Sequence, residues 1–340
     1  MRWKDQTVDA LERQRLPGYA EAAAVRTFDS PKVRDTRFYE VEAKTALNRV
    51  PGPRTPFGWT VNPYRGCTHS CSYCYARPSH EFLGLDAGEG FDREIVVKVN
   101  IAERLRRELG RKSWRQELVA LGTNTDPYQW AEGPYRLMRG IWQALRDHEN
   151  PASVLTKSPL LLRDLDLMKE LSERAPFTAY LSVPTLDEEA WRLTEPRSPN
   201  PRSRLDALRK LSAAGISTGV VIAPLLPGIN DDPEKVAEIT ETAMAAGAES
   251  VDALPLHLRG STKDIFFERL RTVYPQFVSR YEELYGDGSE MAGGEQRRLL
   301  ALAGPRGRTW EKRIEERRER EAEERTITAR PPDSTQGRLF

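Results

Sequence analysis

Three cysteines are the residues whose type and spacing most clearly indicate chemistry in this sequence. Cys67, Cys71 and Cys74 are the only cysteines among 340 residues, and their spacing is C-x3-C-x2-C. An odd number of clustered thiols is a poor framework for disulfides, whereas thiolates are soft ligands that suit iron–sulfur clusters or zinc. Three thiolates can hold three irons of a four-iron cube, which leaves the fourth iron open to a substrate or cofactor.

Two other interpretations of the cysteines stay open at this point. The three thiols could lie together by chance. Alternatively, they could form a zinc site that is completed by His69 or His80. Structural zinc normally has four ligands, and the chain has no second cysteine pair to supply the rest. The pattern therefore favours a cluster with an open iron.

The bulk composition limits the class of protein. Hydrophobic residues make up 39% and charged residues 30%, which allows a sizeable core beneath a polar surface. The formal net charge is only +1, so any nucleic-acid surface would be a local patch. We see no apolar secretory segment at the N-terminus and no stretch near the roughly 20 apolar residues that span a bilayer. We therefore expect no membrane partner and a cytoplasmic location, which suits reduced thiols.

Short apolar runs alternate with stretches of helical periodicity. The runs predict six strands at Trp59–Val61, Glu117–Gly122, Ala152–Thr156, Phe177–Val183, Thr218–Ala223 and Ser250–Leu256. The helical stretches lie at Tyr135–Asp147, Leu160–Leu171, Arg202–Ala213 and Pro233–Ala246. This alternation predicts an α/β fold with a parallel sheet and right-handed crossovers. Six such units indicate a partial (β/α)6 TIM-type barrel, although periodicity alone also allows a doubly wound sheet.

The remaining predictions concern the segments before and after this barrel and one further apolar run. Residues 1–58 are expected to form an N-terminal extension, residues 59–260 the barrel, and residues 261–327 a helical C-terminal region. Residues 328–340 have the composition of a disordered tail. Glu94–Val99 is a further apolar run that we expect to be extended without joining the main sheet.

The cysteine motif, with an aromatic residue before its last cysteine, resembles the radical S-adenosylmethionine (SAM) superfamily. The wider match is to its spore-photolyase-like branch. It is carried by NPYRGCTHSCSYCYARPSHE, ALGTNTDPYQ, LTKSPLLLRDLDLM, EPRSPNPRSRL, VVIAPLLPGIND and LPLHLRG. The resemblance implies a [4Fe–4S] cluster on Cys67, Cys71 and Cys74. It also implies SAM on the open iron and an external electron donor of the flavodoxin or ferredoxin type. Reductive cleavage of SAM would give a 5′-deoxyadenosyl radical that abstracts hydrogen.

The same resemblance implies a set of cofactor-binding residues. Tyr73 matches the aromatic position near the adenine, and Lys157 matches a lysine that approaches the cofactor carboxylate. Ser182 matches a polar contact at the end of the fourth strand. The Gly-Gly-Glu run common in the superfamily is replaced by the polar residues Thr123, Asn124, Thr125 and Asp126. A strand-end surface lysine and a core serine are the alternative interpretations of Lys157 and Ser182.

Two features keep nucleic acid among the candidate substrates. The first feature is two groups of basic residues, one of which contains a tryptophan. These groups could equally be solvated helix faces. They consist of Arg104, Arg106, Arg107, Arg111, Lys112, Trp114 and Arg115, and of Arg197, Arg202 and Arg204. The second is the C-terminal run containing Gln336, Leu339 and Phe340, which resembles the bacterial sliding-clamp binding motif.

Three functional hypotheses follow from the sequence. The first is a radical SAM enzyme that acts on nucleic acid, and the second is one that acts on a small metabolite or peptide. The third is a non-enzymatic iron–sulfur or zinc-binding protein. Spore photoproduct lyases use an additional cysteine as hydrogen donor, and this chain has no fourth cysteine. We therefore do not carry over thymine-dimer repair, and no catalytic residue is assigned.

Overall fold

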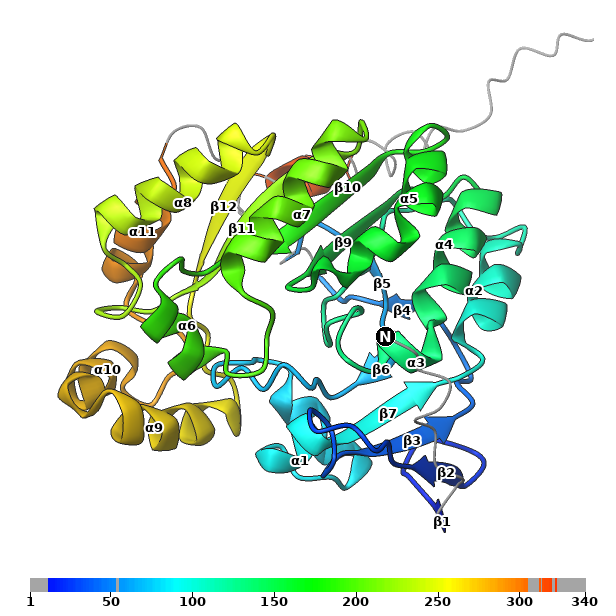
Figure 1. Cartoon of the computed structure of the whole chain (residues 1–340), viewed down its shortest axis with the longest axis horizontal. Coiled ribbons are helices and arrows are strands. Elements are labelled where there is room, and N and C mark those ends of the chain that lie inside the picture. The colour runs from blue at the N-terminus through cyan, green and yellow to red at the C-terminus, as the bar shows by residue number, and fades with distance from the viewer. Residues whose placement is uncertain (1–11, 53–54, 305–311, 313, 320–321, 323–340) are drawn as a thin grey trace, which may run out of the picture.

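Six parallel strands form the framework of the main sheet. In the computed structural model, which describes residues 12–52, 55–304, 312, 314–319 and 322, the strand order is β12-β11-β10-β9-β8-β5-β4 (Figure 1). The strands are β4 (Asn48–Arg49), β5 (Trp59–Val61), β8 (Val119–Leu121), β9 (Ala152–Thr156), β10 (Phe177–Ser182), β11 (Ser217–Leu225) and β12 (Ser250–Pro255). All pairs from β5 to β12 are parallel, and only β4 is antiparallel. The outermost strands do not pair, so the barrel is open, which confirms the predicted fold class.

The predicted strands all occur in the main sheet. Ala152–Thr156 matches β9 at both ends, while the run predicted at Glu117–Gly122 shortens to Val119–Leu121. β11 extends two residues beyond its predicted end at Ala223. Most strand residues are buried on both sides, because helices cover the outer face and side chains fill the interior. Strand ends therefore follow loop geometry that apolar periodicity does not encode.

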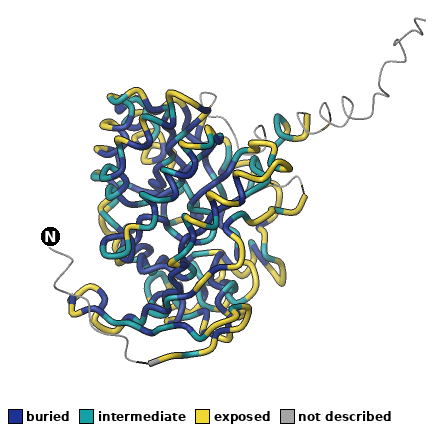
Figure 2. The backbone as a smooth tube through the Cα atoms, turned by 90° about the vertical axis from the view of Figure 1, so that its right-hand side faces the viewer, coloured by how far each residue is buried: buried dark blue, intermediate teal, exposed yellow. Residues whose placement is uncertain are grey.

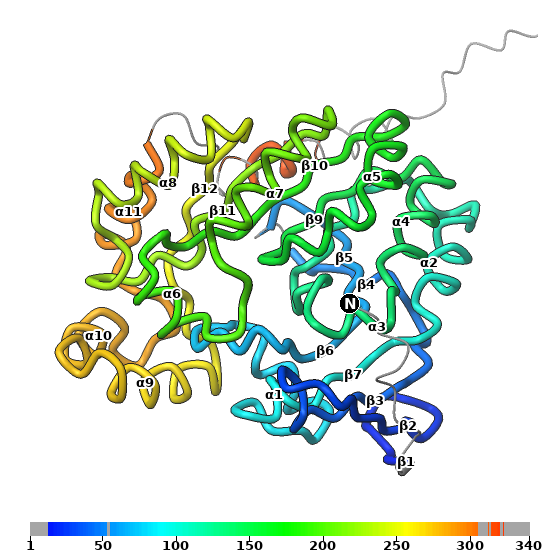
Figure 3. The backbone as a smooth tube through the Cα atoms, in the orientation of Figure 1, coloured from blue at the N-terminus to red at the C-terminus, as the bar shows by residue number. Residues whose placement is uncertain are grey.

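Helices connect successive strands and cover the outside of the sheet (Figures 1 and 3). They are α2 (Ile101–Leu109), α4 (Leu137–Asp147), α5 (Leu165–Ser172), α6 (Glu188–Thr194), α7 (Pro201–Ala213) and α8 (Pro233–Ala245). Asp232 caps α8 by accepting from the backbone N–H groups of Glu234 and Lys235. The predicted helix Tyr135–Asp147 is wrong at its start. Arg136 has φ 53°, which separates α4 from the short α3 (Glu132–Tyr135).

A second sheet lies beside the barrel and has the order β1-β2-β3-β7-β6. Its strands are β1 (Glu12–Gln14), β2 (Ala23–Arg26), β3 (Arg37–Val41), β6 (Tyr64–Arg65) and β7 (Glu94–Lys98), and α1 (Glu89–Arg93) leads into β7. The prediction that Glu94–Val99 is extended outside the main sheet is confirmed. Phe28 and Phe38 of this sheet pack with Trp130 and Tyr135, which places the sheet against the loop that follows β8.

The C-terminal part is helical, as predicted for its described residues. It contains α9 (Thr262–Val273), α10 (Val278–Tyr285) and α11 (Gly293–Ala301), and residues 314–319 are also helical. Buried residues run through the centre of the molecule and exposed ones along its outer loops (Figure 2). Gln336, Leu339 and Phe340 lie outside the described residues. No helix in the described part of the chain is long and apolar enough to cross a membrane.

Lys98, at the end of β7, is a buried cation. It is 6% exposed, and its Nζ donates to the backbone oxygen of Asn62 at 2.8 Å. Among the described residues, no carboxylate forms an ion pair with it. Burial, with a smaller contribution from Arg65, lowers the pKa of Lys98 to about 7. The ammonium form therefore opposes folding below that pH.

Replacing Lys98 with methionine should stabilise the protein by about 1–3 kcal/mol at pH 6. The advantage should shrink between pH 7 and 10.5, because the unfolded chain keeps the proton there while the folded wild-type chain has lost it. Urea unfolding across this pH range measures the effect, with the exposed Lys44→Met as control. A variant that is equally destabilised at every pH would contradict the prediction.

Candidate functional site

The three cysteines lie in a loop (residues 66–75, called the cysteine loop) that follows β6. Gly66 opens it with φ +78°, and a Cβ there would lie 2.8 Å from the backbone oxygen of Phe91. That oxygen accepts from the backbone N–H of Cys67 at 3.0 Å. Cys67 and Cys71 are buried and Cys74 is half-buried, and all three are free thiols. Cys74 packs against both core clusters that contain the other two.

The environment of the thiols opposes their ionisation. Burial raises the pKa of Cys67, Cys71 and Cys74, and the carboxylates of Asp126 and Glu195 raise those of Cys67 and Cys71 further. A metal centre would therefore have to displace the thiol protons on binding. Within the described residues, no group of three or more His, Cys, Asp or Glu side chains already has the geometry to hold a metal ion. The donor set suits a soft metal centre, but the thiols would need to turn toward a common point.

The two candidate zinc ligands are engaged elsewhere. A ring nitrogen of His80, Nε2, lies 2.8 Å from the backbone oxygen of Glu94. The other, His69, faces Asp126, whose Oδ2 lies 3.4 Å from His69 Nδ1. These contacts do not favour a zinc site completed by histidine.

Arg77 holds the backbone of the cysteine loop through hydrogen bonds. Its Nη2 donates to the backbone oxygen of Cys71 at 3.0 Å and to Asp92 Oδ1 at 3.0 Å, while Nη1 donates to the backbone oxygen of Gly88 at 2.7 Å. The backbone N–H of Ser72 donates to the backbone oxygen of Thr194 in α6 at 3.0 Å. The backbone around the thiols is therefore held by the segment that directly follows the cysteine loop and by α6, which lies between β10 and β11.

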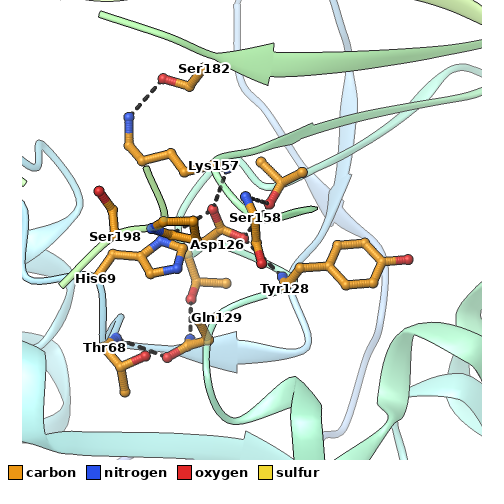
Figure 4. A network of polar contacts seen from close by, with 12 residues as sticks. Thr68, His69, Asp126, Tyr128, Gln129, Lys157, Ser158, Ser182 and Ser198 are labelled. Atoms are coloured by element: carbon orange, nitrogen blue, oxygen red, sulfur yellow. Dashed lines mark hydrogen bonds and ion pairs between the residues drawn. The ribbon is translucent and has the colours of Figure 1, made fainter. Parts of the chain in front are cut away.

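The loop after β8 (residues 123–130, called the β8 loop) packs on the inner side of the cysteine loop. It is preceded by Gly122, where φ is +85° and a Cβ would lie 1.9 Å from the backbone oxygen of Leu155. Only glycine allows strand β9 to approach this closely. Figure 4 shows Asp126 and Gln129 of this loop beside Thr68 and His69.

Lys157, which directly follows β9, belongs to a buried charge network. Its Nζ lies 2.8 Å from Glu195 Oε1 and donates to Ser182 Oγ at 2.7 Å. It also lies 5.6 Å from the centre of the Tyr73 ring, whose hydroxyl donates to Glu195. Arg204 of α7 pairs with the other oxygen of Glu195 and donates to the backbone oxygen of Ser182 at 2.7 Å. The two cations and one carboxylate leave a net charge of +1 near Cys71.

The charges fix Glu195 in its ionised form. Burial alone would raise its pKa, but Arg204 and Lys157 lower the pKa of Glu195 well below its usual range. Both Glu195 and Arg204 have fully buried side chains. The network therefore keeps its net positive charge throughout the range in which the protein would be assayed.

The structure brings most of the predicted site residues to the carboxyl ends of β8, β9 and β10. Thr123 Oγ1 accepts from Asn62 Nδ2 at 3.3 Å, and the backbone N–H of Asn124 donates to Asn62 Oδ1 at 3.1 Å. Glu195 joins this group by pairing with both Lys157 and Arg204. The roles of Gln129 and Arg204 were missed, because their burial depends on how the loops and α7 pack.

Several residues of the two basic groups are engaged in contacts within the protein. The indole of Trp114 packs edge-on against Trp59 and donates to Asn150 Oδ1 at 2.7 Å, so it is not a free stacking platform. Arg204 is buried in the Glu195 network. In α2, Arg106 and Arg107 pair with carboxylates on the same or a neighbouring helix. These contacts agree with the alternative of structural and solvated residues.

Comparisons with known proteins agree with this geometry. The family model described as the radical SAM superfamily matches residues 61–239. An uncharacterized protein of Mycobacterium tuberculosis is 45% identical over 293 residues, which cover 85% of this chain and 86% of the relative. A radical SAM Nα-GlyT isomerase of Pseudomonas phage M6 is 26% identical over 70% of this chain and 47% of its own length.

Solved structures show the same fold. A spore photoproduct lyase complexed with dinucleoside spore photoproduct has a TM-score of 0.60 at 15% identity, over 80% of this chain and 81% of the lyase chain. A variant of such a lyase with bound AdoMet has a TM-score of 0.58. This likeness agrees with the predicted branch at the level of the fold. Because the family match covers more than half of the sequence, the chain belongs to the radical SAM superfamily and is a radical SAM enzyme.

Proposed function

We propose that Cys67, Cys71 and Cys74 hold a [4Fe–4S] cluster and that the adjacent charge network binds SAM. When bound, these two groups supply a 5′-deoxyadenosyl radical for hydrogen abstraction from substrate. The observation that carries the proposal is the net positive network of Lys157, Glu195 and Arg204 beside three free thiols. Superfamily membership supports both cofactors.

Lys157 is the group best placed to meet the carboxylate of SAM. Its ammonium is held by Glu195 and Ser182, so little rotational freedom is lost when a ligand binds. Since Glu195 also pairs with Arg204, the lysine is not fully neutralised by its own carboxylate partner. The ring of Tyr73 lies beside it and provides an apolar wall, as expected for the predicted adenine side.

Replacing Lys157 with methionine should weaken SAM binding by about 10- to 100-fold, which corresponds to roughly 1.4–2.8 kcal/mol. Removing the ammonium leaves Glu195 facing the cofactor carboxylate. Equilibrium dialysis with the cluster-loaded enzyme measures the dissociation constant. Lys169→Met, on the outer helix α5, is a matched control that should bind as wild type does. Unchanged SAM affinity in Lys157→Met would remove this residue from the proposed site.

The experiment that tests the proposed function is SAM cleavage. The full chain is reconstituted anaerobically with iron and sulfide and reduced with dithionite, and 5′-deoxyadenosine is measured by chromatography. We expect cleavage that depends on iron and on reductant. An intact cluster without any 5′-deoxyadenosine would overturn the proposal and return the chain to the class of non-enzymatic iron–sulfur proteins.

Nucleic acid is the substrate class that we propose to test first, with a small metabolite or peptide as the alternative. The support is a shared fold with a lyase solved in complex with dinucleoside spore photoproduct. Binding to single- and double-stranded DNA is measured over a range of salt concentrations, because phosphate contacts make affinity fall with salt. Absence of salt-dependent binding would favour the alternative. The clamp-binding tail, the flavodoxin-type donor and the cytoplasmic location stay predictions.

A further inference from the structure

We propose that Gln129 and Asp126 of the β8 loop are positioning residues that hold the cysteine loop, and that Asp126, unlike Gln129, also holds the backbone of Lys157. The inference rests on the proposed function and assigns a different task to the segment that replaces the Gly-Gly-Glu run. In place of direct contact with the cofactor, these side chains order the residues that contact it.

Gln129 holds the cysteine loop on both sides of Cys67. Its side chain is fully buried. Its Oε1 accepts from the backbone N–H of Thr68 at 2.9 Å, and its Nε2 donates to the backbone oxygen of Gly66 at 3.0 Å. Nε2 also donates to Thr125 Oγ1 at 2.9 Å, and that hydroxyl donates to the same Gly66 oxygen at 2.6 Å. One amide therefore fixes the residues before and after the first thiol.

Asp126 contacts the next part of the loop. Its Oδ2 lies 3.4 Å from Nδ1 of His69, the residue midway between Cys67 and Cys71. His69 is buried, and its Nδ1 makes no hydrogen bond of good geometry within the described part of the chain. The carboxylate is thus the polar group that this buried nitrogen faces.

The same carboxylate holds the end of β9. Oδ2 accepts from the backbone N–H of Lys157 at 2.8 Å, while Oδ1 accepts from Thr156 Oγ1 at 2.6 Å and from the backbone N–H of Tyr128 at 2.9 Å (Figure 4). A carboxylate has about four lone-pair sites, and these three hydrogen bonds use three of them. Most of the acceptor capacity of Asp126 is therefore used within the protein, and we assign this carboxylate to positioning rather than to direct contact with the cofactor.

Because the two residues have different contacts, we expect different effects when each is replaced. In the described part of the chain the Gln129 side chain hydrogen-bonds to the cysteine loop and to its own β8 loop, so its loss should affect retention of the metal centre. Asp126 touches both the cysteine loop and the backbone of Lys157, so its loss should affect metal retention and SAM affinity together. Outer partners of metal ligands typically change metal affinity by about 10- to 100-fold when they are replaced.

Three near-isosteric variants of the full chain test this division. They are Gln129→Met, Asp126→Asn and, as matched control, Asp164→Asn. Asp164 is another fully buried carboxylate beyond the end of β9, but it accepts from Tyr128 Oη at 3.0 Å and has no contact with the cysteine loop. Three readouts are compared, namely iron released per hour to a chelator, SAM dissociation constant of the loaded fraction, and amide hydrogen exchange of the cluster-free chain.

We expect Gln129→Met to release iron about tenfold faster while SAM affinity of the loaded fraction stays within twofold of wild type. Asp126→Asn should release iron faster and also bind SAM about tenfold more weakly. In the cluster-free chain, exchange should rise at residues 66–71 in both variants, and at residues 156–158 only in Asp126→Asn. Asp164→Asn should leave all three readouts unchanged.

Two results would overturn the inference. One is that Asp126→Asn and Gln129→Met behave as Asp164→Asn does. The other is that Gln129→Met weakens SAM binding as much as Asp126→Asn, because the division between the residues would then be absent. Hydrogen exchange requires neither cluster nor cofactor, so a wild-type chain that fails to cleave SAM would still leave the positioning roles testable.

Discussion

Replacing any one of Cys67, Cys71 and Cys74 with alanine should abolish SAM cleavage, with a fall in 5′-deoxyadenosine formation on the order of 10³-fold or more. The chain has no fourth cysteine that could take over as ligand. His69 and His80 are already engaged with Asp126 and a backbone oxygen, so neither is free to replace a lost thiolate. Two thiolates would hold the cube too weakly for it to survive reduction.

The measurement separates loss of the metal centre from loss of the fold. Iron and sulfide content, the electron paramagnetic resonance signal after reduction and the melting temperature are recorded with the product assay. Ser72→Ala is the control within the same loop, because the backbone N–H that binds Thr194 is kept and only a side-chain hydroxyl is lost. A cysteine variant that retains full iron content and normal cleavage would refute the ligand assignment for that residue.

The sequence predicted the barrel well because its signals are local. Buried parallel strands are short apolar runs, and the intervening helices carry a 3.6-residue period, so β9 could be placed at both ends. The helix predicted to start at Pro233 does start there, where a proline suits the first turn. The cysteine spacing likewise singled out the loop to which we assign the cluster, without any knowledge of the fold.

The predictions fell short where structure depends on distant contacts. The N-terminal extension shows no clear period, yet it contributes three strands to the second sheet, because β3 pairs with β7 from more than fifty residues away. Arg204 was counted with a basic surface group, since nothing in its neighbourhood signals that α7 turns it toward Glu195. Gln129 was not singled out, because a lone glutamine gains a role only when the cysteine loop packs on it.

Arg204 leads to the second large effect that we expect. Replacing it with methionine should destabilise the protein by about 3–5 kcal/mol, because Glu195 is left fully buried with Lys157 as its only cation. The same change should weaken SAM binding about tenfold, since Lys157 is then neutralised by Glu195 and the net positive charge of the network is lost. Arg202→Met on the same helix removes only an exposed ion pair with Glu238 and should change stability by less than about 0.5 kcal/mol.

The pH dependence distinguishes this mechanism from a simple packing defect. The pKa of Glu195 is lowered in the folded protein, so its contribution to stability is present above its unfolded value of 4.5 and is lost as the pH falls through the folded pKa. Urea unfolding of wild type and Arg204→Met should therefore converge as the pH falls below 4.5. A constant difference at all pH values would indicate lost packing. The double variant Glu195→Met/Arg204→Met should regain part of the stability, because it removes the buried charge together with its partner. It should not restore the position of the Lys157 ammonium, because Glu195, its ion-pair partner, is absent.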